Sequence, residues 1–159
     1  MLAVIGEVVA VNHASGTFEV KVIPQAPNGE APIVGRMSLE KQFQGDLAAA
    51  SKVEMLTAIT PVKGSAGYVA IEWVSGALDG RSGAFALQHS GTMTRGVSQL
   101  TVVPDSGTEE LTGLIGSMTI KITDGKHFYD FEYTLTQTSY VVVYDPLTYF
   151  IANVIDLLQ

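Results

Sequence analysis

The side chains of this 159-residue sequence that could carry acid–base or metal chemistry are few and widely spaced. Its three histidines, His13, His89 and His127, have no partner at the H-x-H or H-x₃-H spacing typical of metal sites. The sequence contains no cysteine, no glycine-rich phosphate loop and no G-x-S-x-G or H-E-x-x-H motif. We therefore predict no metal and no cofactor, and we assign no catalytic residue.

Two polar residues, His89 and Lys41, stand within apolar alternating segments. A histidine in an apolar site could act as a general acid or base near neutral pH, or orient a ligand carbonyl. A lysine in the same surroundings could pair with a ligand carboxylate. Each also has a plain structural explanation, because a buried histidine is usually a satisfied core residue and a lysine can extend to the rim of a barrel.

The elements that must position these residues are predicted to be short antiparallel strands. Apolar residues alternate with polar ones, and glycine punctuates the pattern. The dipeptides Asp79-Gly80 and Asp124-Gly125 stand between such segments and predict type I′ hairpin turns. The predicted strands lie at 16–23, 36–47, 53–60, 67–75, 83–93, 97–103, 117–123 and 126–135.

Such strands indicate an all-β barrel or sandwich. We favour one antiparallel eight-stranded barrel, because closing the sheet removes its exposed edges. The interior of an eight-stranded barrel has room for side chains or for one small ligand. We predict one domain over 1–159, with the barrel core at 14–136 and a strand-and-helix extension at 137–159. The helix is indicated by the capping residue Asp145, by Pro146 and by the apolar spacing that follows.

Five blocks of the sequence resemble the bacterial DUF3224 family, a domain family of unknown function. These blocks are GTFEVK, KQFQGDL, GYVAIEWVSGALDGRSGAFALQHSGTMTRG, VVPDSGTEELTGLIGSMTI and GKHFYDFEYTL, between residues 16 and 135. The resemblance implies an allene oxide cyclase-like, or calycin-like, eight-stranded barrel that forms oligomers. It implies no catalytic residue, because no catalytic motif of the allene oxide cyclases is shared.

A mostly apolar cavity with a few polar groups is the usual form of a small-ligand site. Alternation predicts which side chains line the barrel: His89, Lys41, Trp73, Tyr129, Tyr133, Phe85 and Met55. A shift of one residue in register would exchange the faces of a strand. The alternative face then supplies Glu72, Gln88 and Tyr68.

Our first functional hypothesis is a barrel that binds a small, largely apolar molecule. The second is a structural, oligomeric interaction protein with a packed barrel, and the third is a cofactor-free isomerase or cyclase assisted by His89 or Glu72. The formal net charge of −7 argues against nucleic acid as a partner. No apolar segment has the length and continuity of a membrane span or a signal peptide, so we expect a cytoplasmic protein without a membrane partner. The family resemblance implies that it forms a homo-oligomer.

Overall fold

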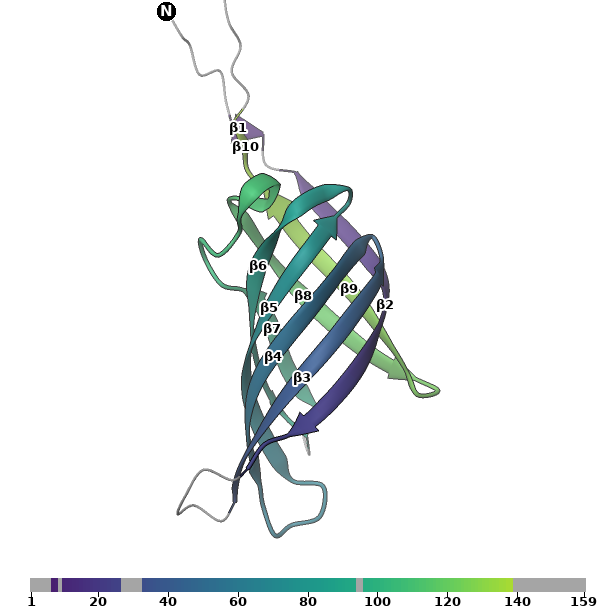
Figure 1. Cartoon of the computed structure of the whole chain (residues 1–159), viewed down its shortest axis with the longest axis vertical. Coiled ribbons are helices and arrows are strands. Elements are labelled where there is room, and N and C mark those ends of the chain that lie inside the picture. The colour runs from purple at the N-terminus through teal and green to yellow at the C-terminus, as the bar shows by residue number, and fades with distance from the viewer. Residues whose placement is uncertain (1–6, 9, 27–32, 94–95, 139–159) are drawn as a thin grey trace, which may run out of the picture. The chain divides into compact units, whose positions relative to one another are not determined.

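Eight strands close into an antiparallel barrel, as the sequence predicts (Figure 1). The computed structural model describes residues 7–8, 10–26, 33–93 and 96–138. Ala10–Leu135 forms one compact unit, which contains the barrel. In a separate unit, β1 (Glu7–Val8) and β10 (Gln137–Thr138) pair as a two-stranded antiparallel sheet. The predicted C-terminal helix lies outside the described residues.

The barrel strands follow one another around the barrel in chain order, and β9 closes it by pairing with β2. A single-turn 3-10 helix, η1 (Glu109–Leu111), lies in the connection between β7 and β8. The strands are β2 (Val11–Pro24), β3 (Val34–Gly45), β4 (Leu47–Ile59), β5 (Ala66–Leu78), β6 (Arg81–Thr92), β7 (Val97–Val102), β8 (Leu114–Thr123) and β9 (Lys126–Leu135).

Both predicted hairpin turns are present. Leu78 pairs with Arg81 across Asp79-Gly80, and Thr123 pairs with Lys126 across Asp124-Gly125. All four turn residues have positive φ, between 48° and 78°, as type I′ turns require. These two-residue turns fix the register of β5 against β6 and of β8 against β9.

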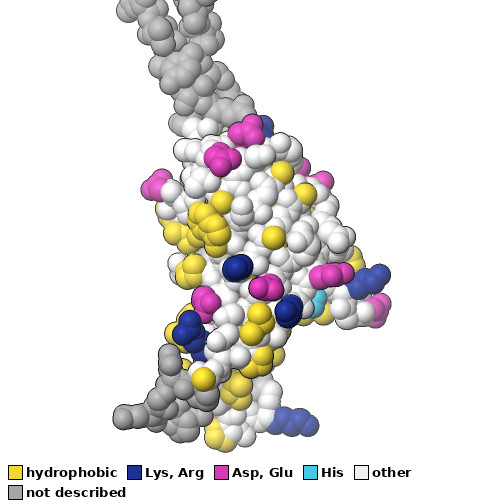
Figure 2. All heavy atoms as spheres, in the orientation of Figure 1, with side chains coloured by type: hydrophobic (Ala, Val, Ile, Leu, Met, Phe, Trp, Pro, Cys, Tyr) yellow, Lys and Arg dark blue, Asp and Glu magenta, His cyan; other side chains and the backbone are white. Residues whose placement is uncertain are grey.

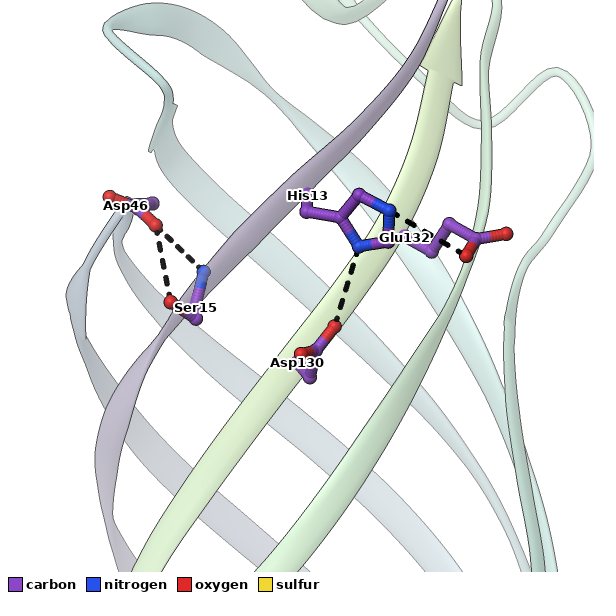
Figure 3. Close-up of polar contacts among 5 residues, drawn as sticks. All are labelled: His13, Ser15, Asp46, Asp130 and Glu132. Atoms are coloured by element: carbon purple, nitrogen blue, oxygen red, sulfur yellow. Dashed lines mark hydrogen bonds and ion pairs between the residues drawn. The ribbon is translucent and has the colours of Figure 1, made fainter.

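The predicted strand at 36–47 is wrong at its end, because the chain turns at Asp46. Gly45, the last residue of β3, has φ of 108°, a conformation that favours glycine. The Asp46 carboxylate accepts a hydrogen bond from the Ser15 backbone N–H at 2.8 Å, which ties the turn to β2 (Figure 3). The next strand, β4, therefore starts at Leu47, earlier than the predicted start at residue 53. The prediction missed this start because the alanines at 48–50 show no alternation of apolar and polar residues.

Aromatic side chains fill one end of the barrel, which we call the tyrosine end. There Tyr129 Oη accepts a hydrogen bond from the Leu47 N–H at 2.8 Å and donates one to the Gln44 carbonyl at 3.2 Å. Tyr133 Oη donates a hydrogen bond to the Asp79 carboxylate. Phe131 is fully buried, with its ring centroid 5.8 Å from that of Phe85. Packed rings and bonded hydroxyls thus occupy this end.

Candidate functional site

Cross-strand pairing groups the inward-facing side chains into rows, because directly paired residues lie on the same face of a sheet. Two rows lie at the end of the barrel opposite the tyrosine end, which we call the methionine end. The mouth row is Gly35, Thr57, Tyr68 and Gly91, paired in that order from β3 to β6. The methionine row, one step deeper, is Met37, Met55, Ala70 and His89.

The methionine end holds a hollow of about 420 Å³. Met37, Met55, Thr57 and Tyr68 line it from the strands, together with Met93 and the β4–β5 loop at 60–65. These four strand residues are only half-buried, and none of them belongs to the packed core cluster. Methionine is flexible and polarizable, so such a lining can adapt to the shape of an apolar ligand.

One buried polar atom in this lining has no partner within the described residues. Thr57 Oγ1 is buried and makes no hydrogen bond. A Cβ atom added at Gly35 would come within 2.8 Å of it, so the missing side chain of Gly35 makes room for the hydroxyl. In the same way a Cβ atom at Gly91 would come within 2.6 Å of the Tyr68 ring. The two glycines of the mouth row thus shape the hollow around Thr57 and Tyr68.

Deeper in the barrel, four polar side chains form a buried cluster centred on Glu72. Lys41 Nζ donates a hydrogen bond to Glu72 Oε2 at 2.7 Å, and Ser51 Oγ donates one to Glu72 Oε1 at 2.5 Å. His89 Nε2 lies 2.8 Å from Glu72 Oε2, but this contact lacks the direction of a hydrogen bond. Lys41 and Glu72 are buried, so an opposite charge at contact distance compensates each of them.

The cluster keeps Glu72 ionised. Burial pushes the pKa of its carboxyl up, but His89, Lys41 and Ser51 together push it down by more, so the net pKa lies below its ordinary value of 4.5. A depressed folded-state pKa stabilises the fold above the ordinary value, and this contribution is lost as the pH falls through the folded-state pKa.

We therefore expect the free energy of unfolding to fall below about pH 4.5, the ordinary pKa of the Glu72 carboxyl. Urea unfolding measured from pH 7 to pH 3 checks this. The double variant Lys41→Met/Glu72→Leu lacks the buried carboxylate, so its stability should depend less steeply on pH. If the double variant loses as much stability as the wild type over this range, Glu72 is not responsible.

The predicted interior residues divide between the two faces of the barrel wall. His89, Lys41, Phe85, Tyr129 and Tyr133 are buried, and Met55 lines the hollow. Trp73 is 48% exposed on the outer face, which corrects the prediction that it lines the barrel. The inward positions of β5 beside it belong to Glu72 and Val74, both fully buried.

The three residues predicted for the alternative face do not lie on one side of the barrel wall. Glu72 and Tyr68 point inward with His89, whereas Gln88 lies on the exposed outer face. Sequence reasoning missed Thr57, Met37 and Ser51 as partners of this site. The alternating pattern could have located them. Met37 lies an even number of residues from Lys41 on β3, and Ser51 and Thr57 lie an even number from Met55 on β4, so each pair shares one face of its strand.

The outer wall of the barrel also carries apolar side chains (Figure 2). On β4 and β5, the exposed members are Leu56, Val69, Ile71 and Trp73. Exposed apolar patches commonly mark interaction surfaces. The homo-oligomer inferred from the sequence stays a prediction.

A polar cluster on the outer wall surrounds His13 of β2. Its ring nitrogens lie 3.8 Å from Asp130 and 3.8 Å from Glu132, both on β9 (Figure 3). All three side chains are more than 60% exposed, so these contacts are weak surface interactions. In the described part of the chain, no group of three or more His, Cys, Asp or Glu side chains is arranged to hold a metal ion.

Comparison with known protein families shows which family this chain belongs to. The family described as a protein of unknown function, DUF3224, matches residues 14–133. The chain belongs to the DUF3224 family. The match spans the mouth row, the methionine row and the Glu72 cluster, so all three lie within the DUF3224 domain.

A solved DUF3224 structure has the same fold. It is a protein of unknown function from Shewanella oneidensis MR-1 that is 50% identical to this chain, with a TM-score of 0.75. The similarity covers 79% of this chain and 98% of that one. No curated protein matches the chain. Among the described residues of this DUF3224 protein, no helix is long and apolar enough to cross a membrane.

Proposed function

We propose that this DUF3224 barrel binds a small, largely apolar molecule in the hollow at its methionine end. The observation that carries the proposal is a hollow of about 420 Å³ with an apolar lining and one buried, unpartnered hydroxyl, that of Thr57. Small-molecule sites are concave and mostly apolar, with few polar groups, and their volumes begin at about 300 Å³. This hollow matches that description.

The difference between the two ends of the barrel supports the proposal. At the tyrosine end, Phe43, Phe85 and Phe131 are almost fully buried, and the hydroxyls of Tyr129 and Tyr133 have partners. A packed and satisfied interior leaves no room for a ligand. At the methionine end the four strand residues that line the hollow stay half-buried, so a ligand there would cover apolar surface that is now exposed.

The test is a titration with 1-aminoanthracene, an uncharged apolar probe whose fluorescence rises in an apolar site. We expect saturable binding to the wild type. Met55→Trp, which fills the hollow, should weaken binding at least tenfold. The protein's single tryptophan, Trp73, lies on the outer wall, so the probe's own fluorescence is the readout.

Leu56→Trp is the matched control, because Leu56 is the next residue on β4 and is 49% exposed on the outer face. It should leave the affinity for 1-aminoanthracene unchanged. Circular dichroism of both variants checks that the barrel is intact. Absence of saturable binding, or binding that a folded Met55→Trp variant retains in full, would contradict the proposal.

A further inference from the structure

We infer that the ligand of this hollow is uncharged and that its polar group bonds to the hydroxyl of Thr57. This inference rests on the proposed function and narrows it to a chemical class, namely neutral amphipathic molecules such as alcohols or ketones. Two observations carry it: the pairing of the buried charges with each other, and a buried hydroxyl of the lining that has no partner among the described residues.

The first observation concerns charge. Among the described residues, the buried lysine and acidic side chains are Lys41 and Glu72, and the ring of the buried His89 lies 2.8 Å from the Glu72 carboxylate. Lys41 and Glu72 neutralise each other at 2.7 Å, and the Glu72 carboxylate also accepts a hydrogen bond from Ser51. An ion that entered the interior would therefore find Lys41 and Glu72 already paired with each other. Burying an unpaired carboxylate or ammonium group is costly, whereas a neutral molecule avoids that cost.

The second observation concerns hydrogen bonding. The hydroxyl of Thr60 also belongs to the lining, but it already donates a hydrogen bond to the Ser65 carbonyl at 3.1 Å. Thr57 Oγ1 has no such partner within the described residues. A hydroxyl can both donate and accept, so it suits a ligand alcohol or a ligand carbonyl. A ligand that supplies this bond gains affinity, because the buried hydroxyl is otherwise unsatisfied.

Among the described residues, one cation lines the hollow and gives the main alternative, an anionic ligand. Lys63, in the β4–β5 loop, belongs to the lining but is exposed to solvent. An anionic amphipath could pair with it at the rim, but exposed ion pairs contribute little. We therefore expect Lys63 to have no part in selecting the ligand.

The test compares 1-octanol, octanoate and octylammonium as competitors of 1-aminoanthracene at pH 7. The three share one alkyl chain and differ in their head groups. We expect octanol to bind at least tenfold more tightly than either ion. Thr57→Val keeps the shape of the side chain but removes the hydroxyl, and it should weaken octanol binding about three- to tenfold. Lys63→Gln tests whether octanoate competes by pairing with Lys63 at the rim.

The outcomes separate this inference from the proposed function. If 1-aminoanthracene does not bind at all, the proposed function fails and the inference fails with it. If the probe binds but octanoate competes as well as octanol, and Lys63→Gln abolishes that competition, the ligand is an anionic amphipath. In that case the inference is overturned while the proposed function stands. Equal octanol affinity in Thr57→Val and wild type would also overturn it.

Discussion

Glu72→Gln is expected to lower the free energy of unfolding by about 3–5 kcal/mol. Glutamine keeps the size of the side chain but removes the charge that compensates Lys41, whose ammonium group lies 2.7 Å from the carboxylate in the barrel interior. A buried charge without its partner is strongly destabilising, because it has lost its hydration and gained nothing in return. Urea unfolding at pH 7 measures the effect.

The control is Glu54→Gln, which removes a carboxylate from the exposed pair of Arg36 and Glu54. That pair lies 3.0 Å apart at the surface, where water screens it, so stability should hardly change. Lys41→Met/Glu72→Leu should recover most of the loss, because apolar residues of similar size replace a buried ion pair well. If Glu72→Gln is as harmless as Glu54→Gln, the Glu72 cluster is not buried in the barrel.

Phe131→Ala is expected to cost about 3–5 kcal/mol of stability, as is usual when a buried aromatic residue is truncated. Its ring is fully buried and packs against Phe85 and Tyr133, with centroid separations of 5.8 Å and 5.4 Å. The variant would leave a cavity, because the tightly packed neighbouring rings do not move enough to fill it.

Phe128 on the same strand is the matched control, because it lies on the outer wall and is 39% exposed. Phe128→Ala should cost about 1 kcal/mol or less. Thermal or urea unfolding of both variants checks the register of β9, since a shift of one residue would exchange the two effects. Equal losses in the two variants would contradict the inward position of Phe131.

The barrel was predictable because its strands alternate regularly and its turns have distinctive residues. On β9, Tyr129, Phe131, Tyr133 and Leu135 were predicted to share one face, and all four are buried. Asp124-Gly125 fixed where that strand begins. The start of β4 could not be read in this way, because consecutive alanines have no polar alternation.

The inward position of Glu72 could have been deduced from the sequence, although side-chain polarity pointed the other way. Trp73 is large and apolar, so it was assigned to the interior in place of its acidic neighbour. The predicted Asp79-Gly80 turn already contradicts this assignment. Counted outward from a two-residue turn, Glu72 pairs with Leu87, which lies on the face of His89. Turn geometry is thus a better guide to this strand's register than the hydrophobicity of its residues.

The charge cluster itself could not be deduced from spacing. Lys41, Ser51 and Glu72 come from three consecutive strands, and the side chains meet diagonally between rows of the barrel. The hollow was equally hidden, because alternation shows which side chains face inward but not whether they fill the space between them. The packed residues of the tyrosine end and the half-buried Met37 and Met55 follow the same alternating sequence pattern.

The most direct test of ligand binding at the methionine end is an NMR titration of the methionine ε-methyl groups with 1-octanol. The sequence has five methionines, of which Met37, Met55 and Met93 line the hollow. Met118 belongs to the packed core and is 3% exposed, so it serves as an internal control. We predict saturable shifts of the Met37 and Met55 signals while Met118 stays unchanged. No saturable shift at Met37 or Met55 would contradict the proposed site.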